Sequence, residues 1–111
     1  MMPLFIVVSS DKLGEGEKEL GELLMGNFLK SVASESKLPS AVFLVNRGVF
    51  LATGSSAAAD FLGHLQEQGV SILLCQTCVE YYGISKEVAV GEISGMSKLA
   101  EMVTSGRVVF L

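Results

Sequence analysis

Short apolar runs rich in β-forming residues alternate along the chain with longer segments whose apolar residues recur at helical spacing. The apolar runs show no polar alternation, as expected for strands buried on both faces of a sheet. Strands that alternate with helices form right-handed βαβ units and a parallel sheet. We therefore predict an α/β fold, a three-layer α/β/α domain around a mostly parallel five-stranded sheet. The predicted strands are residues 4–8, 41–45, 71–75, 87–90 and 107–111.

The helical spacing also predicts where helices begin and end and which faces they bury. Helices are expected at about 16–35, from a cap at 55 or 56 to 69, at about 78–83, and from a cap at Ser94 to 106. Between the second strand and the second helix, residues 46–48 are predicted to turn and 49–51 to form a short extended piece. The buried stripe of the first helix is predicted to be Leu20, Leu23, Leu24, Phe28 and Val32. That of the last helix is predicted to be Met96, Leu99, Ala100 and Val103.

Length and composition restrict the class of protein. The 111 residues suit one domain, 1–111. The net charge is −4 and no Lys/Arg cluster occurs, so we expect neither a nucleic-acid partner nor a membrane surface. The apolar runs are far shorter than the roughly 20 residues that cross a bilayer. The first residues lack a basic segment and a cleavage site, so we expect a cytoplasmic protein. A mean hydropathy of +0.51 predicts surplus apolar surface and a homo-oligomer.

The two cysteines form the sharpest candidate site. Cys75 ends the third predicted strand, and Cys78 follows where the chain becomes helical. Thr77 and Glu80 have the spacing of a capping box, which would place Cys78 in the first helical turn. Backbone N–H groups at a helix start favour thiolate, so we expect a lowered pKa for both thiols. The alternative is that one or both cysteines are small buried hydrophobic residues.

Other chemistries have weaker support. The loop from Ser9 to Gly16 follows the first strand but offers only Gly14-x-Gly16 among acidic neighbours, so no nucleotide cofactor is expected. A zinc site needs four ligands, whereas the chain has two Cys and one His, His64. A Ser-His-Asp triad would need that same histidine, which lies on a polar helix face. We therefore predict no metal and no hydrolase site.

The cysteine motif and several other stretches resemble the DsrE/DsrF-like sulfur-relay family, and most closely the DsrE-type domain of its YedF-like selenium-metabolism branch. The resemblance implies a parallel α/β/α fold, oligomers, and sulfur carried as a cysteine persulfide. Cys75 has the family's spacing of eight residues before Gly83, which implies that it is the carrier, and Cys78 matches the second cysteine of the branch. The stretches are Ser9-Ser10-Asp11, Glu19–Met25, Asn46-Arg47-Gly48-Val49, Cys75–Gly83 and Val88–Met96.

We therefore predict a sulfur carrier or sulfurtransferase-like protein. The Cys75 thiolate would take sulfane sulfur from a donor protein and pass it to an acceptor protein, with Cys78 as an auxiliary thiol. Two alternatives remain open: thiol–disulfide redox chemistry at this pair, and a non-enzymatic oligomeric module that binds a small ligand or a protein. The residues predicted to bind the substrate are Ser9, Ser10, Asn46, Gln76 and Thr77.

Overall fold

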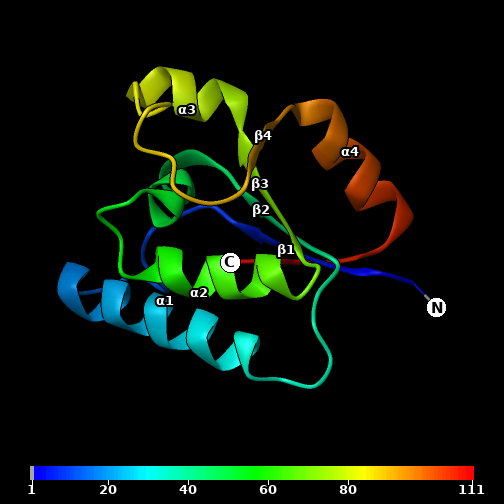
Figure 1. Cartoon of the computed structure of the whole chain (residues 1–111), viewed down its shortest axis with the longest axis horizontal. Coiled ribbons are helices and arrows are strands. Elements are labelled where there is room, and N and C mark those ends of the chain that lie inside the picture. Colours follow the sequence, from blue (N-terminus) through cyan, green and yellow to red (C-terminus); the bar gives the residue numbers. More distant parts are fainter. Residues whose placement is uncertain (1) are drawn as a thin grey trace.

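The computed structural model describes residues 2–111 and shows a five-stranded sheet with helices around it (Figure 1). The strand order is β4-β3-β2-β1-β5, and every neighbouring pair is parallel. The predicted α/β fold is confirmed. The strands are β1 (Leu4–Val8), β2 (Ala41–Leu44), β3 (Ser71–Cys75), β4 (Glu92–Ser94) and β5 (Arg107–Phe110). The helices are α1 (Lys18–Ala33), the 3-10 helix η1 (Asn46–Ala52), α2 (Ala58–Glu67), α3 (Gln76–Tyr82) and α4 (Met96–Ser105).

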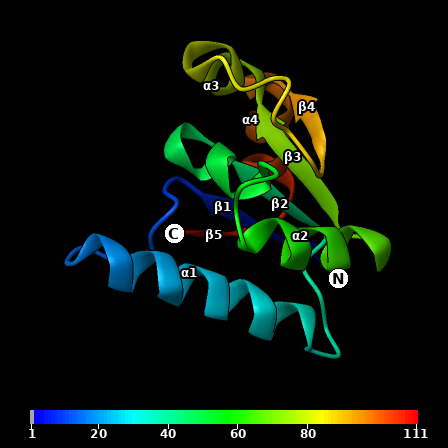
Figure 2. The same cartoon turned by 60° about the vertical axis from the view of Figure 1, so that its left-hand side comes forward.

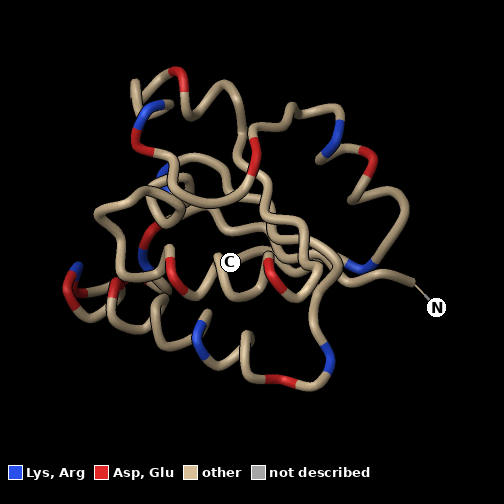
Figure 3. The backbone as a smooth tube through the Cα atoms, in the orientation of Figure 1, with Lys and Arg blue, Asp and Glu red and all other residues tan. Residues whose placement is uncertain are grey.

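The path of the chain explains the layers. From β1 to β4 the chain advances one strand at a time in one direction, so right-handed crossovers place α1 and α2 on the same face. The chain then returns across the sheet to β5, and α4 lies on the opposite face (Figure 2). Met25 and Leu62 pack in the larger core, under α1 and α2, and Met102 of α4 packs against Phe43 in the smaller one. Charged residues lie mostly on the outer helices and loops, while the central strands carry few (Figure 3).

The fourth strand was predicted wrongly at residues 87–90 and lies instead at Glu92–Ser94. Residues 87–90 are held by the loop before α2: Val88 forms an isolated antiparallel bridge with Thr53, and the N–H of Ala89 bonds to the carbonyl of Ala52 at 2.8 Å. Gly91 then turns the chain onto the edge of β3 with φ +84°, a conformation that favours glycine. The apolar residues Val88 and Val90 thus pack from a loop, which the sequence pattern does not distinguish from a strand.

Residues 49–51 are not extended as predicted but belong to η1. The 3-10 helix starts at Asn46, whose φ of +51° is left-handed, and it presses Gly48 against the end of β1. Val49 and Ala52, three residues apart, are both fully buried, as the three-residue period of this helix requires. The element continues directly from β2 and therefore ends up beside the carboxyl edge of the sheet.

The buried face of α1 is rotated from the predicted stripe. Gly21, Met25 and Leu29 are the buried residues, whereas the three predicted leucines are exposed. A Cβ on Gly21 would lie 2.9 Å from the Cβ of Lys12, so only glycine admits this approach of the β1–α1 loop. The exposed side chains are Leu20 (53%), Leu23 (61%) and Leu24 (40%), while Phe28 and Val32 are half-buried against the core.

The last helix also differs in detail. Met102 is its buried residue and Leu99 packs beside it, whereas Met96 and Val103 of the predicted stripe are exposed. Its N-cap is Gly95 without a side-chain hydrogen bond, so the predicted cap at Ser94 is wrong. Ser94 is the last residue of β4 and pairs with Cys75, which leaves it one position short of the cap. In residues 2–111, no helix is long and apolar enough to cross a membrane.

Candidate functional site

The two cysteines lie where β3 passes into α3 without a connecting loop. Cys75 is the last residue of β3 and also the N-cap of α3, and its Sγ accepts the N–H of Cys78 at 3.4 Å. The predicted capping box with Thr77 as N-cap is therefore wrong, because the sulfur of Cys75 already takes that role two residues earlier. The helix ends at Gly83, whose φ of +65° is left-handed, as predicted for a closing glycine.

The sulfur of Cys78 is held from the neighbouring element. Cys78 is half-buried, and its Sγ accepts the backbone N–H of Asn46 at 3.0 Å. The Tyr82 hydroxyl donates to Oδ1 of the same asparagine at 3.1 Å. Because Cys78 and Tyr82 are four residues apart, they share one face of α3, and they bond to the backbone N–H and the side-chain oxygen of Asn46. This contact links the carboxyl ends of β2 and β3.

The exposure of the two cysteines does not follow their predicted roles. Cys75 was predicted to be the sulfur carrier, a role that needs an accessible thiolate, but it is only 2% exposed. It follows Leu73 by two residues, so both side chains point to the face covered by α4, and Cys75 packs with Phe43 and Met102. Cys78 is half-buried and is therefore the more exposed residue of the pair. Alternation along β3 therefore places the predicted carrier in the smaller core.

The acidity of Cys78 also departs from the prediction. Burial raises the pKa of the Cys78 thiol, and the neighbouring Cys75 thiol raises it further through a hydrogen bond and charge repulsion. The N–H of Asn46 acts in the opposite direction, because it stabilises the thiolate. The expected lowering of the pKa is thus wrong for Cys78, and one N–H donor does not offset the loss of water.

We predict that alkylation of Cys78 by iodoacetamide rises with pH to a midpoint above the ordinary cysteine pKa of about 8.5. Replacing Cys75 with alanine removes a hydrogen bond and a charge that raise the pKa, so the midpoint of Cys75→Ala is expected to fall toward the ordinary value. Mass spectrometry of the labelled peptide across pH measures both midpoints. A midpoint below 8.5 in the unmodified protein, or no fall in Cys75→Ala, would contradict this account.

A cation and two aromatic rings border the cysteine pair. The Arg47 guanidinium lies 4.5 Å from the centre of the Phe50 ring and 5.9 Å from that of Tyr82, and its Nη2 pairs with Oδ2 of Asp11 at 3.2 Å. The two rings meet edge to face at 4.8 Å. Arg47, Phe50 and Tyr82 were not predicted as site residues, although the spacing of four residues between Cys78 and Tyr82 was a usable signal.

The other predicted site residues are dispersed. Gln76 and Thr77 are exposed on the first turn of α3, where the side chain of Gln76 bonds to Glu80 at 3.2 Å. The Ser9 hydroxyl donates to the carbonyl of Leu111 at 2.8 Å, and the Ser10 hydroxyl accepts the N–H of Lys12 at 3.0 Å. The two serine hydroxyls thus bond to the backbone next to the ends of β5 and β1, and not to either sulfur.

Between residues 2 and 111, no three His, Cys, Asp or Glu side chains gather closely enough to hold a metal ion.

Both a family model and several solved structures are similar to this chain. The model of the DsrE/DsrF-like family matches residues 2–110. The structure is similar to that of the ychN protein from E. coli, with a TM-score of 0.75, 22% identity and 100% of both chains covered. It is also similar to MTH1491 from Methanobacterium thermoautotrophicum (TM-score 0.71, 16% identity, 97% of both chains). BT1422 from Bacteroides thetaiotaomicron gives a TM-score of 0.68 at 12% identity, over 98% of this chain and 95% of that one. No curated protein matches.

Proposed function

Because the chain belongs to the DsrE/DsrF-like family, which is associated in general with sulfur relay, we propose that it carries sulfane sulfur as a persulfide on its Cys75/Cys78 pair. The observation that supports this most is the position of the Cys78 sulfur. It is accessible to solvent, it accepts an N–H at 3.0 Å, and it adjoins a second thiol. We further propose that the chain falls within the YedF-like branch of the family, on the pattern Cys75-Gln76-Thr77-Cys78.

The transfer is a nucleophilic displacement at sulfur. The Cys78 thiolate attacks the outer sulfur of a donor persulfide, R–S–SH, and a bond forms between the two sulfurs. The donor S–S bond breaks, and its electron pair leaves with the inner sulfur, which takes up a proton as R–SH. The product is Cys78–S–SH, so one sulfur atom moves and no external oxidant or reductant is needed. The raised pKa of Cys78 limits the thiolate fraction at neutral pH, while the thiolate that forms is a stronger nucleophile.

Cys75 is proposed as the partner that protects or releases the sulfur. Its thiol is buried next to Cys78, so it can attack the inner sulfur of Cys78–S–SH, release hydrogen sulfide and leave a Cys75–Cys78 disulfide. An acceptor protein that takes the outer sulfur first would return both cysteines as thiols. In the reducing cytoplasm, which we propose as the compartment, such a disulfide would be transient.

Mass spectrometry after exposure to inorganic polysulfide tests the function. A gain of sulfur on the peptide that contains both cysteines, reversed by a thiol reductant, is the expected result. A loss of two hydrogens in the unmodified protein, together with no gain of sulfur in Cys75→Ser, where Cys78–S–SH cannot go on to a disulfide, would favour thiol–disulfide redox chemistry instead. An unchanged mass would overturn both and leave a non-enzymatic binding module.

We propose that the protein self-associates through the outer face of α1. Leu20, Leu23 and Leu24 are adjacent, and each is between 40% and 61% exposed, which is unusual for a monomer of this size. Light scattering at micromolar concentration is expected to give a multiple of 11.8 kDa. The double variant Leu20→Lys/Leu23→Lys should fall to the monomer mass, whereas Val103→Lys on α4 should not. A monomer mass for the unmodified protein would refute self-association.

A further inference from the structure

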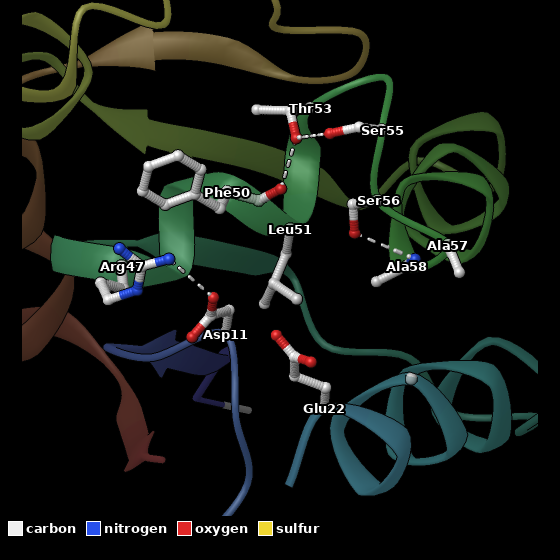
Figure 4. A pocket seen from close by; sticks show the side chains of 11 residues that line it. Asp11, Glu22, Arg47, Phe50, Leu51, Thr53, Ser55, Ser56, Ala57 and Ala58 are labelled. Carbon is white, nitrogen blue, oxygen red and sulfur yellow. Dashed lines mark hydrogen bonds and ion pairs between the residues drawn. The ribbon is translucent and has the colours of Figure 1, made fainter. Parts of the chain in front are cut away.

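A cavity of about 370 Å³ opens between the β1–α1 loop, α1, η1 and the start of α2, and η1 also carries residues of the cysteine site (Figure 4). Its polar lining consists of Asp11, Glu22, Arg47, Thr53, Ser55 and Ser56. The volume falls in the range of sites that bind small molecules. Four separate segments supply these side chains, so the fold and not one local motif assembles the cavity.

The charges in this cavity do not balance. Arg47 pairs with Asp11 at 3.2 Å, and the Asp11 side chain is only 13% exposed, so this carboxylate is largely neutralised. Glu22 is the second carboxylate, and Figure 4 shows it reaching from α1 toward η1, between Asp11 and Ser56. The lining thus holds one guanidinium and two carboxylates, and the remaining negative charge favours a ligand with an ammonium group.

Arg47 retains binding capacity of its own. A guanidinium has five N–H donors, and Asp11 takes one of them through Nη2. Stacking on Phe50 and the bond to Asp11 fix the plane of the group, while its side chain is still 50% exposed. A fixed, accessible guanidinium is well suited to a carboxylate. The hydroxyls of Thr53 and Ser55, 3.4 Å apart, also line the cavity and add polar groups to it.

From this arrangement we infer that the cavity binds a small α-amino acid, with its ammonium group on Glu22 and its carboxylate on Arg47. Arg47 directly follows Asn46, whose N–H bonds to the Cys78 sulfur at 3.0 Å, so the cavity and the thiol share η1. Resting on the proposed function, the inference names the donor class: a low-molecular-weight persulfide of a cysteine-type amino acid. A protein acceptor would then meet Cys78 after the small donor has left.

Calorimetric titration with three matched thiols under reducing conditions tests the charge assignment. L-Cysteine carries both charges, cysteamine lacks the carboxylate, and 3-mercaptopropionate lacks the ammonium. L-Cysteine is expected to bind at least about tenfold more tightly than either analogue. In Arg47→Gln its affinity should fall to that of cysteamine, and in Glu22→Gln to that of 3-mercaptopropionate. The matched controls Arg107→Gln on β5 and Glu19→Gln on α1 should keep the preference.

Equal affinity for the three thiols, or no binding of L-cysteine, would overturn the inference. L-Serine, which has the same charges without a thiol, should slow sulfur uptake from cysteine persulfide but not from inorganic polysulfide. If L-serine leaves sulfur uptake from both donors unchanged, the cavity is not the donor site. The proposed function would still stand in that case. Charge-dependent binding of L-cysteine without sulfur uptake from any donor would instead refute the proposed function and leave an amino-acid site.

Discussion

Replacing Cys78 with serine is expected to reduce sulfur uptake from polysulfide to the background of a protein without cysteines. A serine hydroxyl does not ionise near neutral pH, so the accessible nucleophile is lost. Cys75→Ser should still gain one sulfur per chain, because the Cys78 thiol remains half-buried beside the N–H of Asn46. Intact-mass measurement before and after exposure to the donor, with and without a reductant, gives the result for each variant.

The opposite result has a clear meaning for the site. If Cys75 carries the sulfur and Cys78→Ser retains uptake, the assignment from the eight-residue spacing to Gly83 is correct. Cys75, a residue only 2% exposed, would then have to reach solvent through an opening of the contact between β3 and α4. The double variant Cys75→Ser/Cys78→Ser sets the background against which both single variants are compared.

Replacing Gly48 with alanine is expected to lower the free energy of unfolding by about 3 kcal/mol, since overpacked sites typically cost this much. A Cβ at this position would lie 2.2 Å from the carbonyl oxygen of Val8, which is backbone and cannot rotate away. The same oxygen accepts the N–H of Val45 at 3.0 Å, so a shift would break the junction of β1 and β2. Because η1 carries Asn46, the displacement should also weaken its bond to the Cys78 sulfur.

Thermal unfolding of Gly48→Ala should show a midpoint lower by roughly 10–20 °C. Gly63→Ala in α2 is the matched control. Its Cβ would lie 3.9 Å from Cγ2 of Val90, an ordinary contact, and a helix prefers alanine to glycine by about 0.5–1 kcal/mol. The control is therefore expected to be as stable as the unmodified protein or more stable. Similar losses in both variants would show that the close approach of η1 to β1 is not what makes glycine necessary.

Local patterns predicted the strands and helices more reliably than the way in which these elements pack against one another. The runs at β1, β2, β3 and β5 were placed within a residue or so, because an apolar β-forming run is itself a local property. Val88 and Val90 satisfied the same pattern and yet pack from a loop. An apolar run indicates that a segment is buried, but it does not indicate whether the segment pairs with a strand of the sheet. Leu20, Leu23 and Leu24 were read as buried for a similar reason, although Gly21 turns the other side of α1 toward the sheet.

The sequence by itself determined the parallel α/β class, the end of β3 at Cys75, and the presence of two thiols where a strand becomes a helix. Only the tertiary structure decided which sulfur is accessible, because that depends on α4 covering the face to which Cys75 points. It also decided the environment of Cys78, since Asn46, whose N–H bonds to the sulfur, lies 32 positions away in the sequence. Burial and contact between distant segments are properties of the packed chain, and no local spacing encodes them.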